Sequence, residues 1–166
     1  MNKLLLVLIL VFLYSCKDIV EKEEYLRHVG DIPFDEKLDD PNFKVCNETM
    51  ATVHYAFENP YLYVGEKPAI EAAFRNINFK KADAGSGYIT IRFLVNCEGE
   101  TGRFRVEQMD LEYRDKSFDP DFVKEIVSTC KSLDGWIPAT YKDSSYDYYK
   151  YLSFKIEDYK IIDILP

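Results

Sequence analysis

The first residue whose type and position indicate chemistry is Cys16. A short positively charged start leads into an uncharged apolar run from Leu4 to Leu13. This run is shorter than the roughly 20 apolar residues that span a bilayer, and it suits the apolar region of a signal peptide. The run closes in Leu13-Tyr14-Ser15-Cys16, which matches a bacterial lipobox except that the residue before the serine is usually smaller than Tyr14.

This pattern predicts that residues 1–15 are a cleaved signal peptide and that Cys16 is the lipid attachment site. The thiol would carry a diacylglycerol as a thioether, and buried methylenes contribute about 0.8 kcal/mol each to membrane attachment. We therefore expect a lipid-anchored protein of the bacterial cell envelope, in the outer membrane. Lys17-Asp18 only partly resembles the acidic signals of surface lipoproteins, so the face of the membrane stays open. The alternative is a secreted protein in which Cys16 is incidental.

Three further cysteines follow, Cys46, Cys97 and Cys130. An envelope compartment is oxidising, which favours one disulfide and one remaining thiol. Cys130 falls on the apolar face of a predicted helix, where a small buried thiol is common. We therefore predict a Cys46–Cys97 disulfide, with three unpaired thiols as the alternative.

Catalytic candidates are few. The histidines are His28 and His54, and a lone histidine in a strand is more often structural than catalytic. Cys97 with His54 could form a nucleophile and base, but the disulfide competes for the same thiol. Glu107 and Glu112 could act as a carboxylate pair, although glutamates on strands are common. The chain lacks nucleophile-elbow, zinc-protease and phosphate-loop motifs, so we expect no catalytic residue.

One spacing resembles a metal loop. Asp115, Asp119 and Asp121 are spaced like calcium ligands, but the central glycine and the glutamate at the twelfth position are missing. Asp119 followed by Pro120 instead predicts a helix start, with an N-cap and a proline in the first turn. We therefore expect neither a metal nor a cofactor.

Composition excludes further classes. Removing residues 1–15 from the 166-residue chain leaves 151 residues, enough for one domain with a core. The net charge of −8 becomes −9 because Lys3 is lost, and such an acidic domain does not favour nucleic acid. The 13 tyrosines and 11 phenylalanines suit a β-rich domain.

The elements that must position these residues begin after a charged stretch. Residues 16–42 carry many charges and little apolar pattern, which predicts a lipid-anchored acidic tether before a domain at 43–166. Partial alternation from Val45 to Phe57 predicts one strand, and Lys67 to Phe74 predicts a short helix.

The clearest pattern starts at Tyr88, where apolar and polar residues alternate to Val95. The predicted elements are, in order, this strand, a turn at 96–100, a second strand at 102–111, an amphipathic helix at 120–133 that Gly135 stops, a strand at 146–156 and a last short strand at 161–165. They predict an α+β fold, with an antiparallel sheet, one main amphipathic helix packed on one face, and an N-terminal extension.

This order resembles the C-terminal domain of TonB-family proteins, with its ββαβ arrangement. The residues that carry the resemblance are Gly87 to Gly99 with the Asn96-Cys97-Glu98-Gly99 turn, Phe104-Arg105-Val106, the helix at 120–133, Gly135-Trp136-Ile137-Pro138-Ala139 and Tyr151 to Ile156. The resemblance covers residues 65–157. The lipobox and the high usage of Tyr, Lys and Glu are similar to lipoproteins of the Bacteroidetes.

The resemblance implies a mode of binding. TonB-family proteins link a proton-motive complex of the inner membrane to outer-membrane transporters, by adding an extended peptide to the edge of their sheet. The corresponding edge here would lie between Tyr146 and Tyr151. Its tyrosines would provide the contact area; they are Tyr146, Tyr148, Tyr149 and Tyr151.

This chain departs from the family in its N-terminal part. An energy transducer needs an uncleaved N-terminal helix and a long spacer, whereas this chain has a cleavable signal and a short tether. We therefore expect a non-catalytic module that binds another envelope protein or peptide by strand addition. The alternatives are an energy-transducing role in outer-membrane transport, a small envelope hydrolase, and a half-buried tyrosine strand without a partner.

Overall fold

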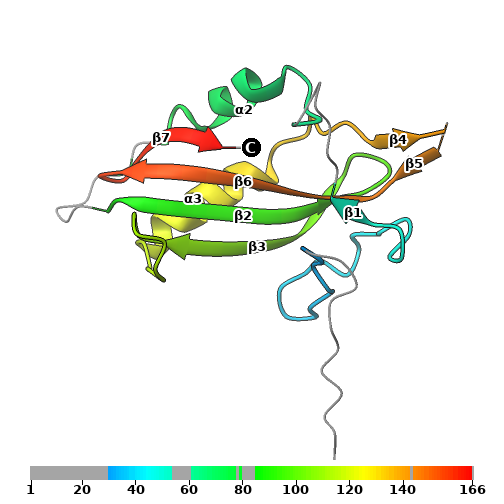
Figure 1. Ribbon diagram of the computed structural model, residues 1–166, viewed down its shortest axis with the longest axis horizontal. Helices are drawn as coiled ribbons and strands as arrows, with labels where there is room; N and C mark the ends of the chain where they lie inside the picture. Colours follow the sequence, from blue (N-terminus) through cyan, green and yellow to red (C-terminus); the bar gives the residue numbers. More distant parts are fainter. Residues whose placement is uncertain (1–29, 54–60, 78, 80–84, 143, 166) are drawn as a thin grey trace, which may run out of the picture.

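The computed structural model describes residues 30–53, 61–77, 79, 85–142 and 144–165 (Figure 1). The predicted signal peptide, Cys16 and both histidines lie outside the described residues. The elements are β1 (Thr52–Val53), α2 (Glu66–Phe74), β2 (Gly87–Val95), β3 (Thr101–Met109), α3 (Pro120–Lys131), β4 (Ala139–Tyr141), β5 (Ser144–Tyr146), β6 (Tyr148–Glu157) and β7 (Lys160–Leu165).

The main sheet has the strand order β1-β6-β2-β3, and β7 also pairs with β6. β2 is antiparallel to both β3 and β6, and β7 is antiparallel to β6. β1 is the exception, because it runs parallel to the start of β6. The predicted α+β class is confirmed, with a sheet that is antiparallel apart from β1.

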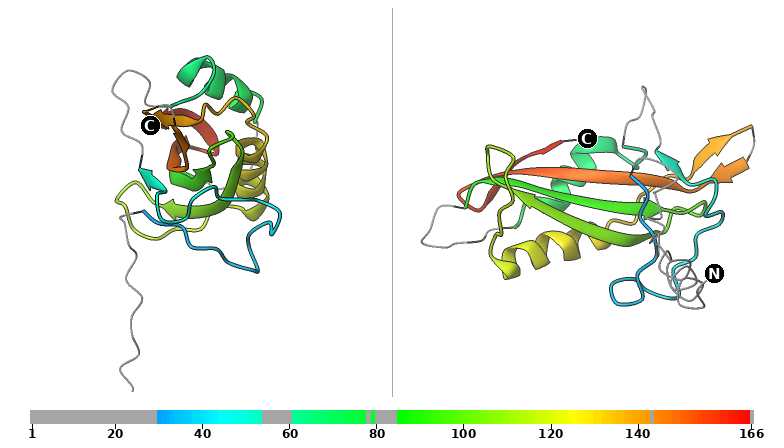
Figure 2. Two further views of the ribbon diagram at one scale, coloured as in Figure 1. Left: turned by 90° about the vertical axis from the view of Figure 1, so that its right-hand side faces the viewer. Right: turned by 60° about the horizontal axis from the view of Figure 1, so that its bottom comes forward.

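The core lies between the sheet and its two helices, which share one side of it in the end-on view of Figure 2. The alternation of β2 turns Ile89, Ile91 and Phe93 toward α3, where all three are fully buried. The helical spacing of α3 turns Phe122 and Ile126 back toward them.

The start of α3 was predicted correctly, because the Asp119 carboxylate accepts the N–H of Asp121 at 2.9 Å as an N-cap. Its predicted end was wrong. The helix stops at Lys131, ahead of Gly135. Gly135 is needed for packing instead, because a Cβ there would lie 2.8 Å from the ring of Tyr63. The short helix predicted at 67–74 is confirmed as α2, which buries Ile70 and Phe74.

The segment 30–53, which we call the N-terminal strap, packs against the sheet. Ile32 in the strap is buried, and Arg103 of β3 donates to its carbonyl oxygen at 3.2 Å. Arg105 of β3 holds the Asp39 carboxylate with bonds of 2.7 and 2.8 Å. Residues 30–42 were predicted as part of a tether, so the folded region begins earlier than the predicted boundary at residue 43.

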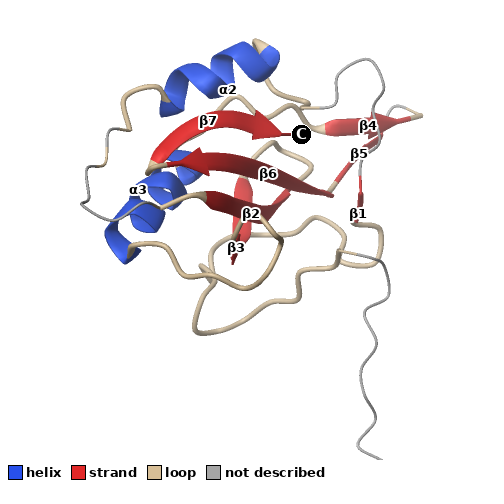
Figure 3. Cartoon of the chain, turned by 60° about the vertical axis from the view of Figure 1, so that its left-hand side comes forward, coloured by secondary structure: helices blue, strands red, loops and turns tan. Residues whose placement is uncertain are grey.

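The strand predicted at 146–156 is two strands that meet at Asp147. β5 pairs with β4 in a hairpin that stands apart from the main sheet (Figure 3), and β6 continues into the sheet. The strand predicted from Val45 to Phe57 comprises only β1 within the described residues. Among the residues that the structure describes, no helix is long and apolar enough to cross a membrane.

Candidate functional site

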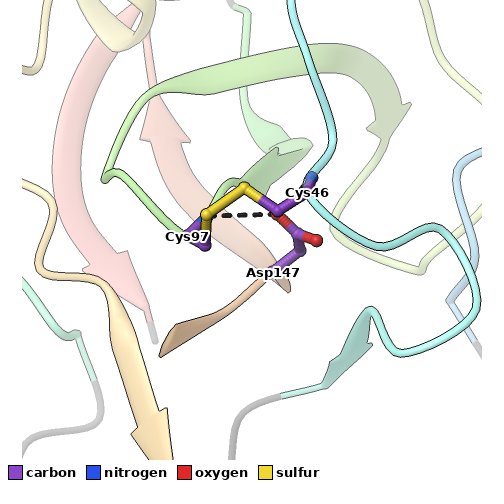
Figure 4. Close-up of side chains that lie close together, drawn as sticks. All are labelled: Cys46, Cys97 and Asp147. Atoms are coloured by element: carbon purple, nitrogen blue, oxygen red, sulfur yellow. Dashed lines mark hydrogen bonds between the residues drawn. A yellow bond between two sulfur atoms is a disulfide. The ribbon is translucent and has the colours of Figure 1, made fainter. Parts of the chain in front are cut away.

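The predicted disulfide between Cys46 and Cys97 is confirmed (Figure 4). It joins the N-terminal strap to the turn that follows β2, across a sequence separation of 51 residues. Cys46 is exposed and Cys97 is half-buried. The third thiol, that of Cys130, is free and buried as expected, and burial raises its pKa to about 12.

Asp147 supports the disulfide from the junction of β5 and β6. Its carboxylate is fully buried and accepts three backbone N–H groups, from Cys46 at 3.1 Å, Cys97 at 3.0 Å and Asn47 at 2.6 Å. Several N–H donors can compensate a carboxylate for its loss of water. Sequence reasoning missed this residue. The sequence signal that could have identified Asp147 is a single acidic residue between Tyr146 and Tyr148, within a predicted strand.

The side chains of Cys46, Cys97 and Asp147 are grouped closely enough to be considered as metal ligands. The sulfurs of Cys46 and Cys97 and a carboxylate oxygen of Asp147 lie within 4.8 Å of one another, and no other such group occurs within the described residues. The sulfurs are bonded to each other, and the carboxylate is engaged by N–H donors. The group therefore acts as a structural link in this form of the protein.

The four tyrosines predicted to bind a partner do not share one surface. Tyr148 is fully buried, and its hydroxyl donates to the carbonyl oxygen of Ile137 at 3.0 Å. Burial raises the pKa of both Tyr148 and Tyr149. Tyr151 is 45% exposed on the face of the sheet opposite the helices. Tyr146 belongs to β5, outside the main sheet.

The edge predicted to be open between Tyr146 and Tyr151 is largely covered. β1 pairs with Tyr148 and Tyr149, and β7 pairs with β6 from Ser153 onward. The reason is that two separate segments, the end of the strap and the C-terminal strand, return to the same side of β6. A partner strand could not pair with Tyr148 or Tyr149 without displacing β1.

The outer edge of β3 is protected at both ends. Phe43 of the strap lies against Gly102, where an added Cβ would approach the ring to 2.3 Å. At the other end, the Lys116 N–H donates to the carbonyl oxygen of Gln108 at 3.1 Å. The side chain of Arg105 also donates to the carbonyl oxygen of Phe104 at 3.0 Å. Such blunting is a common defence of edge strands against further pairing.

The outer edge of β7 is different, because it borders a groove of about 510 Å³ against α2. No strand among the described residues pairs with this edge. The Ile164 N–H donates to the Asp163 carboxylate at 2.8 Å and so is turned away from β6. The groove is lined by Glu71, Phe74, Arg75 and Ile77, and by Lys160 to Ile164.

An ion-pair cluster between α2 and β7 lies at this groove. Lys67 of α2 contacts Asp163 of β7 at 2.7 Å and Glu71 at 3.5 Å. The mutual hydrogen bond raises the pKa of Lys67 and lowers that of Asp163. Both side chains are more than a quarter exposed, so solvent weakens the pair. Ile162, which has no partner residue on β6 because the register shifts there, is 52% exposed.

A second pocket, of about 410 Å³, lies where the strap meets the β4–β5 hairpin. Its lining is Cys46, Asn47, Met50, Thr52, Tyr141, Ser144, Ser145, Tyr146 and Asp147. Tyr146 is the one predicted partner-binding tyrosine that it contains. We call this site the disulfide pocket.

The remaining chemical candidates are in separate contacts. Glu107 pairs with Arg92 at 3.2 Å, and Glu112 pairs with Arg114 at 2.8 Å in the loop after β3. Each glutamate is therefore engaged by a different arginine.

Comparisons with known proteins add no assignment. No family model, no curated protein and no solved structure matches this chain.

Proposed function

We propose that this chain is a lipid-anchored envelope protein that binds an extended segment of another envelope protein, without catalysis, by strand addition along β7. The observation that carries the proposal is the outer edge of β7 beside the α2 groove, which no strand among the described residues pairs with. An edge strand beside a helix offers a partner both backbone hydrogen bonds and a side-chain groove.

The chemistry of the groove supports an amphipathic segment as the ligand. Ile77 and Ile161, which are half-buried, provide apolar surface, while Arg75 and Lys160 add positive charge at the rim. Alternate side chains of an added strand point to opposite faces, so one set would contact this surface and the other would stay in water. The exposed side chain of Ile162 adds apolar contact area at the same edge.

The element order supports the same mode of binding. The β2–β3 hairpin, α3 and β6 follow one another in the order that the TonB-family resemblance implies, and they leave β7 as an additional edge strand. The lipobox ending at Cys16 supports attachment to the membrane in place of a motor-engaging helix. We infer a binding role that needs no energy transduction.

The test is a capture experiment with three variants of the full chain, followed by mass spectrometry of envelope extracts. Ile162→Pro removes the N–H of a residue that has no partner on β6, whereas Ile162→Ala keeps the backbone. Val106→Pro introduces a proline on the outer edge of β3 as a matched control. We expect Ile162→Pro to lose the captured protein and the other two variants to retain it.

Hydrogen exchange then locates the contact. Addition of the captured protein should slow exchange of amides in β7 and leave Val106 unchanged. Equal capture by Ile162→Pro, or protection confined to β3, would contradict strand addition at β7.

A further inference from the structure

The disulfide pocket lies between the strap and the β4–β5 hairpin, next to the point where β1 pairs with β6. The Thr52 N–H donates to the carbonyl oxygen of Asp147 at 3.4 Å, and β1 then follows β6. Upstream of this contact, the strap carries Met50 along one side of the pocket, and Ser145 of β5 lies on the other. Tyr141 of β4 and Ser144 to Tyr146 of β5 line this side, so both strands of the hairpin contribute to the pocket.

The walls of this pocket are aromatic and sulfur-rich. Met50 is 62% exposed and Tyr141 is 66% exposed, although both are large apolar side chains. Tyr146 and the Cys46 side of the disulfide complete the apolar lining. Thioether and aromatic groups attract aromatic rings beyond simple burial, and methionine adapts to the shape of its partner.

The lining offers no free charge, although the chain as a whole carries −8. Asp147 is its one ionisable carboxylate, and that group is buried and holds three backbone N–H groups. The nearby Lys142 ammonium lies over the ring of Tyr141 at 5.1 Å. A positively charged occupant would lose water here without gaining an opposite charge.

We propose that the disulfide pocket binds an uncharged aromatic side chain that projects from an extended segment of a partner protein. A volume of about 410 Å³ is within the range of ligand pockets and accommodates an indole or phenol ring with its flanking backbone. Ser144 and Ser145 of β5 provide hydroxyl groups for hydrogen bonds to that backbone. This site is separate from the β7 groove and does not depend on the function proposed there.

The disulfide is part of the wall, which makes binding sensitive to reduction. Breaking the Cys46–Cys97 bond removes the covalent link between the strap near Met50 and the turn after β2. Asp147 would still hold the backbone of both residues, so the domain as a whole would remain folded.

The test uses photo-crosslinking of the full chain with N-acetyl-4-benzoylphenylalanine amide, an uncharged aromatic probe, and maps the adducts by mass spectrometry. We expect adducts at Met50 and Tyr141. N-acetyltryptophan amide should compete with the probe, N-acetyllysine amide should not, and free indole should compete more weakly than the amide. Equal competition by indole would overturn the assignment to a polypeptide.

Variants separate this site from nonspecific labelling. Met50→Ala and Tyr141→Ala should each weaken competition by N-acetyltryptophan amide by about fivefold, because each removes one sulfur or ring contact. Tyr113→Ala is the matched control, because Tyr113 is 71% exposed in the loop after β3. Circular dichroism verifies that all variants are folded. Unchanged competition in both pocket variants, or equal loss in the control, would refute the proposal.

Discussion

Asp147 and Cys46, which are 101 residues apart in the sequence, meet in a hydrogen bond of 3.1 Å between the Asp147 carboxylate and the Cys46 backbone N–H. The same carboxylate oxygen accepts the N–H of Cys97 at 3.0 Å. One buried side chain therefore orients the backbone of both half-cystines. It positions the strap, the turn after β2 and the start of β6 relative to one another.

Replacing this carboxylate tests its contribution. Asp147→Asn keeps one acceptor oxygen but turns a donor toward the Asn47 N–H, so we expect a loss of about 2 kcal/mol in the free energy of unfolding. Urea denaturation monitored by fluorescence measures it. Asp158→Asn in the exposed β6–β7 turn is the control and should change stability by less than about 0.5 kcal/mol. Similar values for both variants would contradict a special role of Asp147.

The disulfide should stabilise the domain more than any single hydrogen bond. It closes a loop with a sequence separation of 51 residues, for which the chain-entropy relation gives about 4 kcal/mol. The double variant Cys46→Ser/Cys97→Ser should unfold at correspondingly lower denaturant concentration. Limited proteolysis should cut it first within residues 30–53. First cleavage in the β2–β3 hairpin instead would show that the strap is held independently of the disulfide.

Acid should weaken the strap through Asp39. The hydrogen bonds from Arg105 hold the pKa of Asp39 below its ordinary value of 3.8. A lowered folded-state pKa contributes stability above pH 3.8, and this contribution is lost as the pH falls through the folded-state pKa. Asp39→Asn should therefore cost about 2 kcal/mol at neutral pH, and this cost should decrease as the pH falls below 3.8. A pH-independent difference would contradict this explanation.

The elements that could be predicted from the sequence are those whose periodicity matches their burial. The alternation of Ile89, Ile91 and Phe93 identified β2, and the pair Asp119-Pro120 identified the start of α3. The Cys46–Cys97 pairing followed from the helical position of Cys130 and the oxidising compartment. Each of these depends on local pattern or on elimination among three residues.

The features that could not be predicted depend on contacts between distant segments. The strap is rich in charge, and its packing relies on Asp39 meeting Arg105 and on Glu48 meeting Arg103, which no local pattern indicates. The edge expected at Tyr148 and Tyr149 is covered by β1, and sequence periodicity cannot state which strands lie next to β6. The β7 groove and the disulfide pocket arise from the same tertiary pairings.

The reactivity of the free thiol of Cys130 reports whether the core under α3 is closed to solvent. Burial under α3 raises the pKa of Cys130 to about 12, so it should remain a thiol at neutral pH and resist alkylation by iodoacetamide. Labelling should begin only when denaturant unfolds the domain, with a midpoint equal to that from fluorescence. Rapid labelling of the native protein would show that the core opens locally around α3.

Lipid attachment is predicted to depend on Cys16. Cys16→Ala removes the thiol that would carry the lipid. The variant should lose incorporation of labelled palmitate. Cys130→Ala, which alters a buried thiol of the domain, should keep it. Because lipidation requires processing at this cysteine, the variant should also keep the apolar segment from Leu4 to Leu13 and migrate as a longer chain. Normal acylation of Cys16→Ala would exclude the lipobox, and with it the membrane anchor of the proposed function, while leaving the tests of the β7 edge and the disulfide pocket unaffected.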